Sequence, residues 1–191
     1  MELSTCVIAV GLLAAVASPV AAQQASPNPA SPSAGISGFL AMNWGATGKD
    51  VLNAYGEPLM DQVTPDSVRV IVYKDNVLAK SVLALFYLDR TKGLVKGVYS
   101  ASYGDGSDCE VVFQKFRTFV QRLNPTLQPE VKRRHDDPTT AFCDAAAADK
   151  AAWSAAWTEP ATGNSVHLTL EPEEKHVEVA YQSRAFKPVT Q

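Results

Sequence analysis

The sequence predicts an α+β fold in which two tandem helix-plus-three-strand units form one antiparallel sheet with helices packed on one face. Residues 47–56 and 108–123 each carry apolar side chains at helical spacing. Each of these segments precedes stretches in which apolar and polar residues alternate, as they do in strands with one solvated face. The two halves, about residues 39–104 and 105–186, repeat this order, which indicates a single six-stranded sheet.

The first 38 residues have the composition of a leader and a linker. An apolar run from Val7 to Ala17 precedes Val20-Ala21-Ala22, a small-residue cleavage pattern, so we expect a signal peptide over residues 1–22. The alternative is a buried N-terminal helix. The apolar run of 11 residues is too short to span a membrane, which takes about 20 apolar residues. Residues 23–38 are rich in Ala, Ser and Pro and are expected to be a disordered linker. Residues 39–191 would then form a single domain.

Charge and cysteine content fit an exported protein. The chain has 17 Lys and Arg against 20 Asp and Glu, a balance that predicts neither nucleic-acid nor anionic-membrane binding. Cys6 would leave with the signal peptide, and Cys109 and Cys143 would form a disulfide bond in an oxidising compartment. The alternative, a catalytic cysteine, lacks a histidine close in sequence to Cys109. We therefore expect a periplasmic or secreted protein, cleaved near Ala22, with no transmembrane helix in its mature form.

The first helix is predicted between Thr47 and Gly56. The Thr47 hydroxyl can accept a backbone N–H of the first turn, and Asp50 lies where a capping-box acid belongs. Val51, Leu52 and Tyr55 fall at helical spacing and are expected to form the buried stripe of the helix. Gly56 can adopt the left-handed conformation that ends a helix, and a proline follows two residues later.

A meander of three strands is predicted after this helix. Residues 68–73 alternate in the manner of a strand, and residues 94–102 form the third strand. Residues 79–88 are almost continuously apolar, which suits a central strand covered on both faces. Turn signals at Asp75-Asn76 and Thr91-Lys92-Gly93 separate these segments.

The second half is predicted to begin with the most regular helix, which Ser107 or Asp108 can cap and which ends at Asn124-Pro125. Its apolar stripe is Val112, Phe113, Phe116, Phe119, Val120 and Leu123. Residues 125–137 are expected to be a solvated loop, in which Asp136 and Asp137 neutralise the basic cluster 132–135; an anion site is the alternative. Asp137-Pro138 predicts the start of an alanine-rich helix through about Lys150. Strands are predicted at residues 153–158, 165–171 and 176–182.

The segment from Asn43 to Pro58, N-W-G-A-T-G-K-D-V-L-N-A-Y-G-E-P, resembles the pattern that opens the repeats of β-lactamase-inhibitor-protein-like domains. It is also similar to the SmpA/OmlA type of outer-membrane assembly lipoprotein. Both are exported bacterial α/β modules that act by binding other proteins, so the resemblance implies a protein partner in the cell envelope. The chain departs from the assembly lipoproteins, which carry a lipidated cysteine and have one such unit.

The sequence contains no recognisable catalytic constellation. No H-E-x-x-H, G-x-S-x-G or phosphate-loop pattern occurs. The register of the last hairpin would set His176 opposite Glu171, but a metal site would need a third ligand, and His167 lies further along the same face. We therefore assign no catalytic, cofactor-binding or metal-binding residues and expect that the chain is not an enzyme.

Our leading hypothesis is an exported, non-enzymatic protein-binding or inhibitor-like module of the bacterial envelope that meets its partner with an open sheet face. Aromatic residues dominate such contact surfaces. The candidate partner-binding residues are Trp44, Tyr73, Tyr103, Trp153 and Trp157, with Tyr87 as a further candidate. The alternative is a small secreted hydrolase or ligand carrier that uses His135, His167 or His176.

Overall fold

The structure is a computed structural model that describes residues 35–104 and 108–186. Within this part of the chain there are three helices, α1 (Gly48–Tyr55), α2 (Asp108–Leu123) and α3 (Phe142–Ala147). The strands of the first half are β3 (Met60–Val63), β4 (Arg69–Val77), β5 (Lys80–Asp89) and β6 (Gly93–Ser102), preceded by the short pair β1 (Gly38–Phe39) and β2 (Met42–Asn43). Those of the second half are β7 (Glu130–His135), β8 (Ala151–Thr158), β9 (Ser165–Glu171) and β10 (His176–Gln182).

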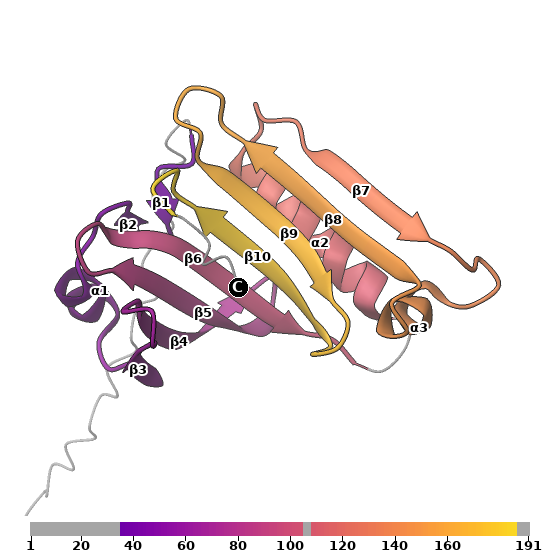
Figure 1. Cartoon of the computed structure of the whole chain (residues 1–191), viewed down its shortest axis with the longest axis horizontal. Coiled ribbons are helices and arrows are strands. Elements are labelled where there is room, and N and C mark those ends of the chain that lie inside the picture. The colour runs from indigo at the N-terminus through magenta and orange to yellow at the C-terminus, as the bar shows by residue number, and fades with distance from the viewer. Residues whose placement is uncertain (1–34, 105–107, 187–191) are drawn as a thin grey trace, which may run out of the picture.

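The described strands, apart from β1 and β2, form one antiparallel sheet in the order β3-β4-β5-β6-β10-β9-β8-β7 (Figure 1). The mixed α and β class and the antiparallel sheet predicted from the sequence are therefore confirmed. The two halves join where β6 pairs with β10, with Tyr99 opposite Val179 and Val98 opposite Ala180. The expected number of six strands is wrong, because β3 and β7 add one edge strand to each half.

The N-terminal predictions fall largely outside the described residues. The signal peptide and most of the linker lie in residues 1–34. The ordered fold begins earlier than the expected start at Phe39, since Ile36 is buried and its carbonyl accepts hydrogen bonds from Trp44 Nε1 at 2.9 Å and Asn164 Nδ2 at 2.7 Å. The bond from Asn164 attaches the N-terminal segment to the second half of the fold.

Helix α1 begins and ends as its local sequence predicts. Thr47 is the N-cap, and it forms a capping box with Asp50 in which Asp50 Oδ2 lies 2.8 Å from the Thr47 backbone nitrogen. The Thr47 hydroxyl also donates to Asp50 Oδ2 at 2.7 Å, and this bond, together with the one from the Thr47 backbone N–H, lowers the pKa of the Asp50 carboxyl. Gly56 ends the helix with a positive φ of 77° and donates its N–H to the Leu52 carbonyl.

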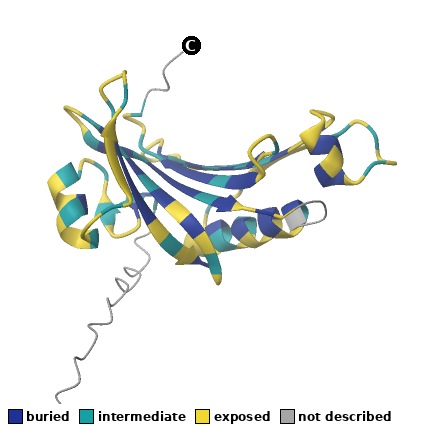
Figure 2. Cartoon of the chain, turned by 90° about the horizontal axis from the view of Figure 1, so that it is seen from below, coloured by how far each residue is buried: buried dark blue, intermediate teal, exposed yellow. Residues whose placement is uncertain are grey.

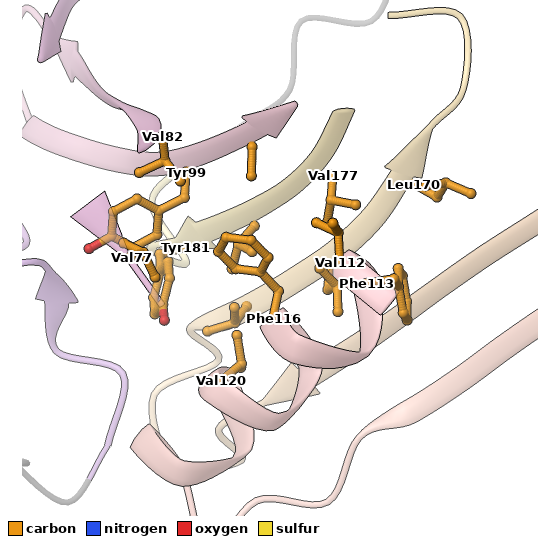
Figure 3. Packing of buried hydrophobic residues seen from close by; sticks show 14 of the residues in the cluster. Val77, Val82, Tyr99, Val112, Phe113, Phe116, Val120, Leu170, Val177 and Tyr181 are labelled. Atoms are coloured by element: carbon orange, nitrogen blue, oxygen red, sulfur yellow. The ribbon is translucent and has the colours of Figure 1, made fainter. Parts of the chain in front are cut away.

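The hydrophobic core lies between α2 and one face of the sheet (Figure 3). Helix α2 contacts β9 and β10, and it buries Val112, Phe113, Phe116 and Val120, four members of its predicted stripe. Figure 2 shows α2 running along one side of the curved sheet. Helices α1 and α3 each contribute buried residues to the same core cluster, Val51 from α1 and Phe142 from α3 among them.

Phe39 packs into this core against a strand that has a glycine at the contact. Its ring lies 5.1 Å from Phe86, 4.8 Å from Tyr99 and 5.6 Å from Tyr181, measured between ring centroids. A Cβ atom on Gly97 would lie 2.0 Å from Cγ of Phe39. Gly97 therefore leaves the space into which the N-terminal segment inserts its aromatic ring.

Two elements of the second half differ from their predictions. The loop predicted over residues 125–137 contains strand β7, which pairs with β8 and sets Arg133 opposite Trp153. The Arg133 guanidinium lies 4.5 Å from the ring centroid of Phe142 and 4.6 Å from that of Trp153, so this polar strand is held by cation–π contacts. Helix α3 is shorter than predicted, because the Asp137 carboxylate bonds Thr139 and Thr140 in a turn instead of capping a helix.

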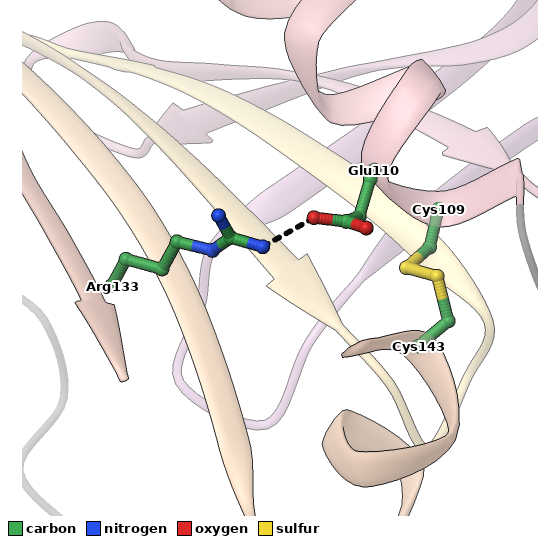
Figure 4. The surroundings of a disulfide bond; sticks show 4 residues. All are labelled: Cys109, Glu110, Arg133 and Cys143. Carbon is green, nitrogen blue, oxygen red and sulfur yellow. Dashed lines mark hydrogen bonds and ion pairs between the residues drawn. A yellow bond between two sulfur atoms is a disulfide. The ribbon is translucent and has the colours of Figure 1, made fainter. Parts of the chain in front are cut away.

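Cys109 and Cys143 are bonded to each other, as predicted, with their Cα atoms 5.9 Å apart (Figure 4). The bond ties the first turn of α2 to α3, and both cysteines are buried. Next to it, Arg133 of β7 forms an ion pair with Glu110 of α2. The disulfide therefore fastens the N-terminal end of α2 to α3, and the ion pair fastens it to the edge strand β7.

Candidate functional site

The sheet face opposite the core cluster is the candidate functional site, and we call it the open face. Alternation along β5 sends Val82, Ala84 and Phe86 into the core and leaves Leu83, Leu85 and Tyr87 on the open face. The strand registers place further residues beside these three. They are Val70 and Val72 of β4, Lys96 and Val98 of β6, Glu178 and Ala180 of β10, and His167 of β9.

Lys96 of β6 lies on the open face and bonds Glu178 of the neighbouring strand β10. Its Nζ atom is 3.3 Å from Glu178 Oε1, and only 17% of the Lys96 side chain is exposed. The register sets Ala180 opposite Val98, with Lys96 and Glu178 in the rows on either side of this pair. The ion pair therefore reaches over Val98 and Ala180, which explains why both are buried on a face that α2 does not cover.

Two aromatic rings flank the Lys96 ammonium group. Its Nζ atom lies 5.1 Å from the ring centroid of Tyr87 and 5.7 Å from that of Phe186. These distances are within the range of cation–π attraction. Burial raises the pKa of the Tyr87 hydroxyl, and the negative charge of Glu178 adds to this effect. Tyr87 therefore remains neutral and offers its ring to the cation.

His167 belongs to the same group of side chains. It lies directly opposite Ala180, and its Nε2 atom is 2.9 Å from the Ser165 hydroxyl on the same strand. Burial lowers the pKa of the His167 imidazole, and the positive charge of Lys96 lowers it further. The imidazole is thus kept in its neutral form beside a cation.

The segment after β10 turns back onto the open face. Ser183 donates its N–H to the Val95 carbonyl at 2.9 Å, and Arg184 donates its N–H to Asn164 Oδ1 at 2.9 Å. Phe186 donates its N–H to the Ser183 carbonyl, which closes a turn that sets the Phe186 ring next to Lys96.

The five aromatic candidates from the sequence lie in or against the core. Trp157 is fully buried and donates Nε1–H to Gln121 at 2.9 Å, while Tyr73 donates its hydroxyl to the Gly56 carbonyl at 3.0 Å. Tyr103 and Trp153 are buried as well, and Trp44 packs half-buried against the core. These side chains present little surface to a partner, because their rings hold the fold together.

The histidines of the alternative hypothesis lie on different strands and do not share one site. His135 bonds the Thr140 carbonyl beside α3, whereas His176 lies 3.3 Å from Glu174 at the start of β10. His176 stands opposite Glu171, as the hairpin register predicts. No group of three or more His, Cys, Asp or Glu that could hold a metal ion occurs among residues 35–104 and 108–186.

A hollow of about 730 Å³ lies on the other side of the sheet, along the outer surface of α2. Leu78, Val111 and Trp153 are among its apolar walls, and Lys115 and Arg122 among its charged ones. None of the described side chains that line it is a histidine. The hollow therefore does not bring together the residues that a histidine-based hydrolase would use.

Sequence reasoning missed the central residues of the open face for an identifiable reason. It predicted that residues 79–88 are covered on both faces, but Leu83 is 43% exposed, so that prediction is wrong for one face. Both faces of β5 are apolar, so alternation does not distinguish them. The sequence feature that indicates this face is Lys96, because it is the one charged residue within the apolar strand β6.

No protein-family model, no curated protein and no solved structure matches the chain. In the part of the chain that the structure describes, none of the helices has the length and apolar character needed to span a membrane.

Proposed function

We propose that this chain is an exported, non-enzymatic protein-binding module of the bacterial envelope, of the inhibitor-like type that its N-terminal pattern resembles. Its contact surface is the open face of the sheet. The observation that carries this proposal is the composition of that face, where exposed Leu83 and half-buried Leu85 and Tyr87 adjoin the Lys96–Glu178 ion pair. Protein contact surfaces combine apolar anchors with a few polar groups in this way.

The disulfide and the charge balance support the proposed location. A buried bond between Cys109 and Cys143 forms and persists in oxidising compartments such as the periplasm. The near-neutral charge of the chain offers no general attraction to nucleic acid. Together with the apolar run and cleavage pattern at residues 7–22, these features favour export over retention in the cytosol.

The order of the strands supports two tandem units of similar plan. Each half has an edge strand followed by a meander, β3 then β4-β5-β6, and β7 then β8-β9-β10. From either edge of the sheet, the four strands of a half follow one another in chain order toward the centre. The two halves meet there in the pair β6 and β10. Helices α1 and α2 precede the edge strands of their respective halves, whereas α3 has no counterpart in the first half.

A pair of matched leucines tests the binding function. Leu83 on the open face and Leu123 in the last turn of α2 are 43% and 42% exposed. The wild-type chain, Leu83→Gln and Leu123→Gln would each be immobilised and used to capture proteins from an envelope extract. We expect saturable capture of a partner by the wild type and Leu123→Gln. Leu83→Gln should capture it at least tenfold more weakly, because loss of a central hot-spot anchor costs about 2 kcal/mol or more and about 1.4 kcal/mol corresponds to tenfold in affinity. Absence of any saturable partner would count against the proposal.

A further inference from the structure

We propose that the site around Lys96 binds an aromatic side chain of the partner, and that Phe186 of the same chain occupies this site until the partner displaces it. This inference rests on the proposed function and specifies what the open face recognises. Two rings lie next to the Lys96 ammonium group. The distance from Lys96 Nζ to the ring centroid is 5.1 Å for Tyr87 and 5.7 Å for Phe186. Tyr87 belongs to the sheet, whereas Phe186 belongs to the segment that follows the last strand.

The chemistry of the site favours an aromatic ring over other ligands. An ammonium group attracts the face of a ring, and this attraction strengthens when water is excluded, as it is at a side chain that is only 17% exposed. A carboxylate or phosphate at the same place would face the negative charge of Glu178, which already pairs with Lys96. An aliphatic side chain would fill space but would gain nothing from the cation.

The attachment of the C-terminal segment allows the ring to leave while the fold stays intact. Ser183 and Arg184 are held by backbone hydrogen bonds to Val95 and Asn164. Ala185 accepts a hydrogen bond from Lys92 Nζ at 3.2 Å. The ring of Phe186 lies beyond these bonds, is partly exposed and belongs to no buried cluster. Its release therefore exposes Lys96 and Tyr87 without opening the core.

The test uses the full-length chain with Phe186→Ala and N-acetyl-L-phenylalaninamide as the probe, followed by NMR of the Lys96 and His167 side chains. We expect saturable shifts in Phe186→Ala and at least tenfold weaker binding to the wild type and to Phe186→Trp, whose own ring fills the site. N-acetyl-L-leucinamide should bind Phe186→Ala at least tenfold more weakly than the aromatic probe. Failure of Phe186→Ala to bind the aromatic probe, or equal binding of both probes, overturns the inference.

Matched lysine variants show whether the cation is responsible. Phe186→Ala combined with Lys96→Met should lose the probe, whereas Phe186→Ala combined with Lys74→Met should keep it, because Lys74 lies on the same face beside Leu83. Retained circular dichroism and cooperative unfolding would establish that both double variants are folded. Undiminished binding by the folded Lys96→Met double variant would contradict the proposed role of the cation.

Capture from an envelope extract separates this inference from the proposed function. If both hold, Phe186→Ala captures the partner at least threefold more tightly than the wild type, and Lys96→Met captures it more weakly. If the probe binds but neither chain captures a partner, the aromatic site stands and the protein-binding function fails. If wild type, Phe186→Ala and Lys96→Met capture the partner equally, the function stands and the inference is overturned.

Discussion

His167 shows how one position on the open face couples stability to pH. In the unfolded chain this histidine protonates near its ordinary pKa of 6.5, whereas burial and the charge of Lys96 lower its pKa in the folded protein. Between the two values the unfolded state binds more protons than the folded state, so the free energy of unfolding falls as pH decreases below about 6.5.

Replacing His167 by glutamine should flatten this pH dependence. We expect the free energy of unfolding of His167→Gln, measured by urea denaturation, to change less than that of the wild type between about pH 6.5 and 5. Thr169→Val on the same strand and face is the control and should keep the wild-type slope, because it removes no titrating group. A wild-type slope in His167→Gln would show that the neutral imidazole does not contribute to acid sensitivity in this range.

At the scale of elements, the contact between the N-terminal segment and β6 depends on one missing side chain. A methyl group at Gly97 would overlap the Phe39 ring, and Gly97 lies opposite Phe86 in the neighbouring strand. We expect Gly97→Ala to lower the free energy of unfolding by about 1–3 kcal/mol through overpacking. Phe39→Ala should lower it by about 3–5 kcal/mol through loss of buried aromatic contacts.

The double variant distinguishes this explanation from a general intolerance of substitution. In Gly97→Ala with Phe39→Ala, the new methyl group enters the space that the ring has left, so the combined loss should be smaller than the sum of the two single losses. Urea unfolding of all four proteins completes the cycle. Losses that add to within about 0.5 kcal/mol would mean that the two residues do not compete for the same space.

The sequence predicts an element well when the residues that start and end it lie close together along the chain. Helix α1 is predictable because Thr47 and Asp50 cap it and Gly56 ends it within one short segment. Strand β7 is not, because its side chains are almost all exposed and polar, and it becomes a strand by pairing with β8 and by stacking Arg133 on Trp153. The residues of the open face could not be predicted for the same reason. Which side chains lie next to one another there depends on the register of β5, β6 and β10.

For the whole molecule, the disulfide bond contributes to the stability of the fold, because it links α2 to α3. It closes a separation of 34 residues between Cys109 and Cys143. We expect Cys109→Ala with Cys143→Ala to lower the free energy of unfolding by about 3–4 kcal/mol, mainly because the unfolded chain gains conformational freedom. Urea denaturation measures this loss. A loss below about 1 kcal/mol would indicate that native contacts around α3 compensate for the missing bond.

Photo-cross-linking tests most directly whether the open face meets a protein partner in the cell envelope. A benzophenone-bearing amino acid would replace Leu83 in one version of the chain and the equally exposed Leu123 in another, in cells that export the protein. We predict a discrete cross-linked adduct from position 83 after irradiation and none from position 123. An adduct from position 123 alone, or the same adduct from both positions, would contradict the assignment of the open face as the contact surface.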